Sequence, residues 1–85
     1  MKYSWFFRIR RLVDTLEGES VEFTCTLTEQ ELHEMFDSGF GGAKGKPFTA
    51  WTENRVYFPV VYDGAEWVGS APRHPCNEAT NHQGG

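Results

Sequence analysis

The sequence predicts a small α+β domain in which one helix packs on one face of an antiparallel sheet of about five strands, in the order β-β-α-β-β-β. Three observations predict it. Residues 47–71 read as three short strands joined by two tight turns, and residues 20–27 alternate between apolar and polar side chains. Between them, residues 28–31 carry the signature of a helix start. A chain of 85 residues suits one domain, and we expect a compact unit over 1–72 and an irregular, flexible tail over 73–85.

The first two strands are predicted over residues 3–13 and 20–27. Polar residues around Gly18 separate them, so a hairpin is expected, with Arg8 and Arg10 lying opposite Glu22. One face of each strand is apolar at period two: Trp5, Phe7, Ile9 and Val13 in the first, and Val21, Phe23, Cys25 and Leu27 in the second.

A helix is predicted over about residues 29–38. Thr28 and Glu31 form a capping box, in which the threonine hydroxyl accepts from the third amide and the glutamate reaches back. Gly39 suits the left-handed position after the last turn, and Phe40 can fold back onto the helix. The expected apolar stripe consists of Leu32, Met35 and Phe36.

A glycine-rich connector, residues 41–46, leads from this helix into the three-stranded meander. Glu53-Asn54 is expected to form the first turn, with Asn54 tolerating positive φ, and Asp63-Gly64 is a strong two-residue hairpin signal. Pro59 lacks an N–H, so we expect it at a bulge or at an unpaired position of its strand.

Charge is distributed unevenly along the chain. The net charge is −4, yet residues 14–37 contain eight acidic residues and no lysine or arginine, so the remainder carries +4. The apolar run at residues 5–7 is too short for a signal peptide, and no segment is long enough to cross a membrane. We therefore expect a cytoplasmic protein, in which an uncovered sheet face with aromatic side chains would allow a homodimer.

Cysteine and histidine residues leave several chemical interpretations open. Cys25, His74, Cys76 and His82 could supply four zinc ligands, but their spacing matches no paired Cys-x-x-Cys knuckle. A Cys25–Cys76 disulfide or two free thiols are the alternatives. The sequence contains no motif for nucleophilic catalysis, and we expect a non-enzymatic protein with no cofactor and no resident metal.

The leading functional hypothesis is a domain that binds a larger protein partner. The regularly spaced carboxylates resemble a DNA backbone in charge, which favours an inhibitor that occupies the basic nucleic-acid-binding surface of a host protein. The short, compact chain without a catalytic constellation suggests a phage or mobile-element protein. The predicted partner-binding residues lie on the helix and on the loop after it: Glu29, Glu31, Glu34, Asp37, Phe40, Lys44 and Lys46.

Nucleic-acid binding is the alternative hypothesis. Arg8, Arg10 and Arg11 alternate with aromatic residues, a composition typical of sheet faces that bind single strands. Lys44 and Lys46 would add positive charge. The glycine-lysine loop is not a phosphate-binding P-loop, because the helix precedes it rather than follows it.

Overall fold

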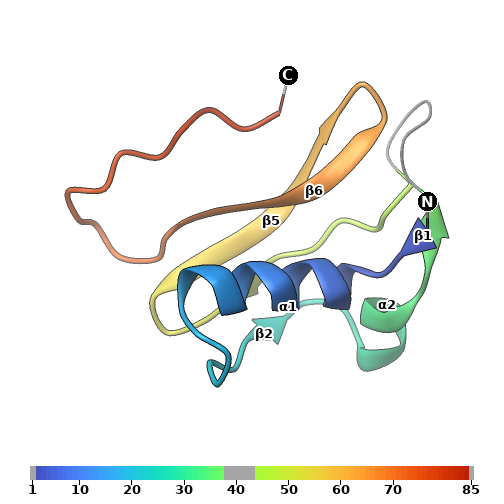
Figure 1. The fold of residues 1–85 in the computed structure, drawn as a ribbon, viewed down its shortest axis with the longest axis horizontal. Coiled ribbons are helices and arrows are strands. Elements are labelled where there is room, and N and C mark those ends of the chain that lie inside the picture. Colours follow the sequence, from blue (N-terminus) through green and yellow to red (C-terminus); the bar gives the residue numbers. More distant parts are fainter. Residues whose placement is uncertain (1, 38–43, 85) are drawn as a thin grey trace.

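The computed structural model of the chain describes residues 2–37 and 44–84 and combines helices with antiparallel strands (Figure 1). The elements of these residues are β1 (Lys2–Tyr3), α1 (Trp5–Leu16), β2 (Thr24–Cys25), α2 (Glu29–His33), β3 (Phe36–Asp37), β4 (Ala50–Trp51), β5 (Arg55–Tyr62) and β6 (Ala65–Pro72). The larger sheet has the strand order β2-β4-β5-β6, and β1 pairs with β3 in a second, two-stranded sheet. The predicted α+β class with antiparallel pairing is therefore confirmed.

The prediction of a strand over residues 3–13 is wrong, because this segment forms α1. Trp5, Ile9 and Val13 are buried, and their spacing of four residues places them on one face of a helix. Ser4 caps the helix by accepting from the amide of Phe7 at 3.2 Å. Gly18 follows its last turn at a φ of 119°, a conformation that favours glycine.

The expected hairpin between residues 3–13 and 20–27 is consequently also wrong. Arg10 does not lie opposite Glu22; it donates to Asp14 one helical turn away, and to the carbonyl of Val21. Residues 20–27 do show the expected alternation, since Val21, Phe23, Cys25 and Leu27 are partly buried and their neighbours are exposed. Only Thr24–Cys25 pair as a strand, with β4.

The helix predicted over 29–38 is shorter in the structure, where α2 ends at His33. Its capping box is confirmed, with both hydrogen bonds between Thr28 and Glu31 present. Leu32 is buried, but Met35 is exposed and Phe36 belongs to β3, so the helical stripe does not continue. The expectations for Gly39 and Phe40 fall outside the described residues.

The meander of β4, β5 and β6 confirms the prediction for residues 47–71. Asp63 and Gly64 both have positive φ, 50° and 83°, as a two-residue hairpin turn requires. The turn at residues 53–54 also forms, but Asn54 does not adopt positive φ; the Thr52 hydroxyl accepts from the Asn54 and Arg55 amides instead.

Pro59 occupies a position whose nitrogen points away from β6. Tyr62 and Ala65 flank the two-residue turn and form the first hydrogen-bonded pair of the hairpin. Hydrogen-bonded pairs alternate along an antiparallel ladder, so the even-numbered residues of β5 make the backbone hydrogen bonds to β6. On its other side β5 pairs with β4 only at Val56 and Tyr57. The proline therefore removes no hydrogen bond from the sheet, as its chemistry predicts.

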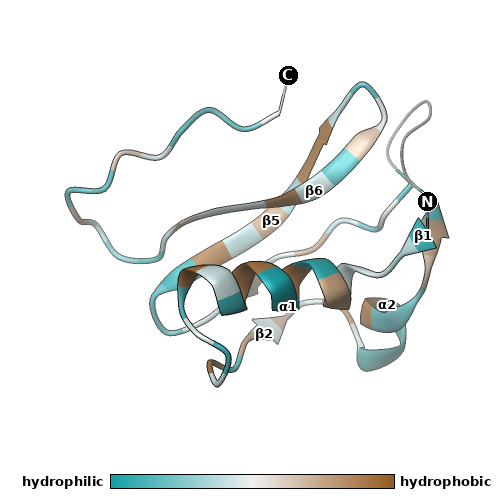
Figure 2. Cartoon of the chain, in the orientation of Figure 1, coloured by the Kyte–Doolittle hydropathy of each residue, from teal (hydrophilic) through white to brown (hydrophobic). Residues whose placement is uncertain are grey.

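The core lies between α1 and one face of the larger sheet (Figure 1). Ile9 and Val13 pack in one cluster with Tyr57 of β5 and Val68 of β6. Bands of hydrophobic residues run along β5 and β6, while the chain after β6 is mostly hydrophilic (Figure 2). In the described residues no helix has the length and apolar character needed to cross a membrane.

Residues 73–84 form neither helix nor strand, and an ion pair fixes them to the sheet. Both terminal nitrogens of Arg55 lie 3.0 Å from the carboxylate oxygens of Glu78, and Arg55 Nε donates to the Ser70 hydroxyl at 2.8 Å. Further along, Gly84 lies against Val60 and Val61 of β5. The segment thus returns alongside the β5–β6 hairpin (Figure 1).

Breaking this ion pair is expected to release the segment without unfolding the domain. Hydrogen bonds from Arg55 lower the pKa of Glu78, so the bond is present above the usual glutamate pKa and is lost as the pH falls through the lower folded value. Glu78→Gln at pH 7 should therefore reproduce the effect of acid on the wild type. Backbone ¹⁵N relaxation of residues 79–83 should show increased motion, with the thermal midpoint nearly unchanged. A variant whose residues 79–83 stay as ordered as in the wild type would contradict this role of Glu78.

Candidate functional site

The predicted partner-binding residues of α2 and the following segment lie close together. Lys46 Nζ is 3.3 Å from Glu31 and 3.8 Å from Glu34, so the lysine lies beside the helix rather than apart from it. Glu29 has 87% of its side chain exposed and lies 3.7 Å from His33. Lys46 and Thr28 lower the pKa of Glu31, with the Thr28 amide as the main cause. The surface is therefore mixed in charge, because a cation lies between two of its carboxylates.

The other predicted partner-binding residues have different positions. Asp37 lies on β3 opposite Lys2. The Lys44 amide is fixed by Glu66 of β6, whose buried carboxylate accepts from the Lys44 and Gly45 amides at 2.9 Å each. Phe40 lies outside the described residues. Glu66 therefore fixes the end of the glycine-lysine loop to the sheet.

The acidic segment 14–37 does not form one continuous face. Asp14 pairs with Arg10, and Glu17 accepts hydrogen bonds from Thr52 and from the buried Tyr57 hydroxyl. Glu31 and Glu34 likewise have Lys46 as a partner, so several of the eight acidic residues are engaged in tertiary contacts. A uniform acidic surface was predicted from charge alone, and the tertiary contacts divide it.

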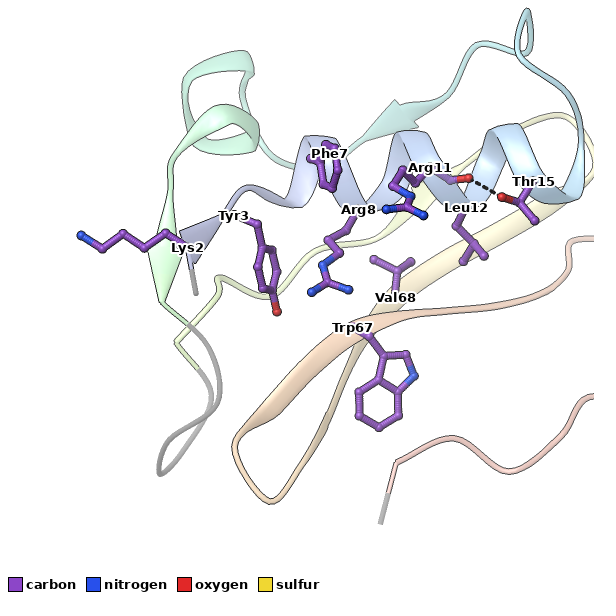
Figure 3. A pocket seen from close by; sticks show the side chains of 9 residues that line it. All are labelled: Lys2, Tyr3, Phe7, Arg8, Arg11, Leu12, Thr15, Trp67 and Val68. Atoms are coloured by element: carbon purple, nitrogen blue, oxygen red, sulfur yellow. Dashed lines mark hydrogen bonds between the residues drawn. The ribbon is translucent and has the colours of Figure 1, made fainter.

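A groove between α1 and β6 carries the opposite charge (Figure 3). Its volume is about 480 Å³. It is lined by Lys2, Tyr3, Phe7, Arg8, Arg11, Leu12, Thr15, Trp67 and Val68. Among the described residues, this lining has three cations and no carboxylate.

Arg8 lies at the centre of this groove, between Tyr3 and Val68 (Figure 3). Its guanidinium stacks on the Tyr3 ring, with Cζ 3.9 Å from the ring centroid. Its Nε is buried and has no hydrogen-bond partner among the described residues. A buried, charged donor without an acceptor is costly, and an anionic group that accepted from it would remove that cost.

Arg11 lies one turn earlier than Thr15 on the same side of α1. Its guanidinium lies over the exposed Phe7 ring at 5.7 Å, and its carbonyl accepts from the Thr15 hydroxyl. Neither Arg8 nor Arg11 has a carboxylate partner in the described part of the chain, unlike Arg10, which pairs with Asp14 at 2.8 Å. The helix therefore directs one arginine into an internal ion pair and two toward the groove.

The groove could not be predicted from a strand over residues 3–13. On a strand, Arg8 and Arg10 share a face and Arg11 lies opposite them. On a helix, Arg8, Arg11 and Thr15 follow one another at spacings of three and four residues and lie side by side. The signals that identify the helix were present: the cap at Ser4 and the Trp5, Ile9, Val13 spacing.

Cysteine and histidine residues form no metal centre in residues 2–37 and 44–84, where no three potential ligands of the His, Cys, Asp and Glu types come together. Both cysteines are free thiols, so the alternative of a disulfide is wrong. Burial raises the pKa of the Cys25 thiol, which disfavours the thiolate that metal binding or nucleophilic attack requires. No family model, curated protein or solved structure matches this chain.

Proposed function

We propose that this protein is a non-enzymatic domain that binds an acidic segment of a larger protein in the groove between α1 and β6. One observation carries the proposal: Lys2, Arg8 and Arg11 line the groove without any carboxylate in its lining. A site that collects one sign of charge attracts partners of the opposite sign and accelerates their association.

The surroundings of the arginines favour a protein partner over nucleic acid. The exposed Phe7 and the half-buried Trp67 add apolar surface on both sides of the charged centre, as in protein interfaces enriched in aromatic residues and arginine. The net charge of −4 disfavours the long-range attraction of a polyanion such as DNA or RNA. An acidic peptide segment requires only the local charge of the groove.

A binding assay with three labelled probes tests the proposal: poly-glutamate, poly-lysine and a single-stranded DNA of 20 nucleotides, each followed by fluorescence anisotropy. We expect poly-glutamate to bind, and the affinity to fall as salt is added. The double variant Arg8→Gln/Arg11→Gln should bind at least about tenfold more weakly, since hydrogen bonds to charged groups contribute roughly 1.5–3 kcal/mol each.

The matched control is Arg10→Gln, which removes a charge from the same helix but from an arginine that already pairs with Asp14. It should change the affinity less than about twofold. Tighter binding of DNA than of poly-glutamate would replace the proposal by the nucleic-acid alternative. Equal losses in the Arg10 variant and in the double variant would show that overall charge, and not the groove, determines binding.

A second candidate function uses the acidic residues of α2 and a basic partner. The observation in its favour is the exposure of Glu29 and of Glu34, whose side chain is 56% exposed. An inhibitor that occupies the nucleic-acid site of another protein would act through this surface. A phage or a mobile element could encode such an inhibitor. Preferential binding of poly-lysine, lost in Glu29→Gln/Glu34→Gln, is the result that would support it.

A further inference from the structure

The outer edge of β6 offers unpaired backbone groups beside the groove. β6 is the last strand of the larger sheet, and its ladder with β5 uses the groups of Ala65, Trp67, Gly69 and Ala71. The groups of the intervening residues point outward, as one contact demonstrates directly: the Tyr3 hydroxyl donates to the Glu66 carbonyl at 2.6 Å.

Val68 and Ser70 are the next two residues with outward backbone groups. In the described part of the chain their outward N–H and C=O groups have no backbone partner. Two donors and two acceptors therefore remain on a stretch of three residues. Val68 itself is buried, and strand edges with unpaired backbone groups pair with extended peptides when nothing occupies them.

Val68 also lines the groove, together with Arg8 and Arg11. An extended segment that paired with Val68 would therefore run past the mouth of the groove. Successive side chains of a strand point to opposite faces, so every second side chain of that segment would face α1 and its arginines. The backbone edge and the cations are thus parts of one surface.

Open space is present beyond the edge. A cavity of about 280 Å³ lies between Val68, Gly69 and Ser70 of β6 and residues 78–81 and Gln83 of the returning C-terminal segment, with Leu12 and Leu16 of α1 and Arg55 completing its lining. The C-terminal segment makes no backbone hydrogen bond to β6 in the described residues. It lies beside the edge without occupying it.

We infer that the partner binds by β-strand addition: an extended segment of the partner protein pairs with Val68 and Ser70 and places an acidic side chain against Arg8 and Arg11. The inference rests on the proposed function and specifies its binding mode. Main-chain bonds supply affinity that is independent of sequence, and the arginines select for Asp or Glu at the position that faces α1.

A displayed library of random nine-residue peptides tests the inference without a known partner. It is selected on the wild-type protein and counter-selected on Arg8→Gln/Arg11→Gln. We expect enrichment of peptides with an acidic residue between β-branched residues. The most enriched peptide is then synthesised in two N-methylated forms, each blocking every second amide, so that one form blocks the amides facing β6 and the other blocks those facing away.

Strand addition predicts that one methylated form loses about tenfold or more in affinity and that the other binds nearly as tightly as the parent. The parent peptide should also slow hydrogen exchange of the Val68 and Ser70 amides. Equal binding of both forms, or unchanged exchange at these amides, would overturn strand addition and leave the acidic groove ligand intact. If selection returns no acidic preference, or the same preference on the double variant, both the inference and the proposed function fail.

Discussion

Replacing Trp5 by alanine is expected to lower the free energy of unfolding by about 3–5 kcal/mol, the range typical of a large buried aromatic residue. Trp5 has only 2% of its surface exposed and lies between the rings of Phe36 and Phe48, at 5.0 and 4.9 Å between centroids. Its indole N–H donates to the Lys46 carbonyl at 3.0 Å. A domain of this size has a total stability of roughly 4–13 kcal/mol, so the variant should be near its unfolding threshold.

Chemical denaturation followed by circular dichroism measures this change. Phe7→Ala is the matched control, because Phe7 lies on the same helix and is half exposed. The decrease in its free energy of unfolding should be small. Trp5→Phe should fall between the two, since it keeps a ring but loses the hydrogen bond to Lys46. Similar midpoints for Trp5→Ala and Phe7→Ala would show that Trp5 does not anchor the core.

Tyr57→Phe is expected to destabilise the protein by about 1.5–3 kcal/mol at pH 7 and to reduce the loss of stability in alkali. The Tyr57 ring is fully buried, and its hydroxyl donates to the Glu17 carboxylate. Burial, the hydrogen bond to Glu17 and the charge of Glu17 all raise the pKa of Tyr57. The folded protein therefore keeps this proton at a pH at which the unfolded chain releases it.

The direction of the pH effect follows from linkage. A group whose pKa is raised in the folded state contributes stability that is fully present below the unfolded pKa, about 10 for tyrosine, and that is lost as the pH rises toward the folded value. The raised pKa of Tyr57 should therefore lower the free energy of unfolding of the wild type by up to about 1.4 kcal/mol for each pH unit above ~10. Urea unfolding at pH 7, 10 and 11 measures this, with Tyr62→Phe as the control, because Tyr62 lies in the same strand and is 58% exposed. Parallel stability curves for the wild type and Tyr57→Phe would contradict the assignment.

Local signals in the sequence predicted the parts of the fold that local chemistry determines. The Asp63-Gly64 turn requires positive φ, and the Thr28–Glu31 capping box is closed within one turn, so both could be recognised without tertiary information. α1 was missed because Trp5, Ile9 and Val13 satisfy both period two and a spacing of four. The groups that resolve this ambiguity, Ser4 before the helix and Gly18 after it, mark only its two ends.

The candidate site depends on contacts that no local pattern contains. Whether an arginine is available to a partner is decided by the groups that reach it, and Arg10 differs from Arg8 and Arg11 in its bonds to Asp14 and to the Val21 carbonyl. The acidic residues were recognised, but their partners are distant in sequence. Lys46 is 15 residues away from Glu31, and Thr52 is 35 residues away from Glu17. Charge patterns thus identified which groups are present, but not which of them are neutralised.

Pro59 has a consequence for how copies of this protein meet one another in concentrated solution. Its missing N–H lies on the side of β5 that β4 leaves unpaired beyond Tyr57, so a strand of another copy cannot extend a regular ladder along that side. β6 has no such residue at Val68 or Ser70. Unprotected strand segments of this kind are sites for edge-to-edge pairing between copies, and the proline protects the part of β5 that extends beyond β4. The sheet therefore blocks pairing along the uncovered part of β5 while the β6 edge at Val68 and Ser70 stays available to a partner.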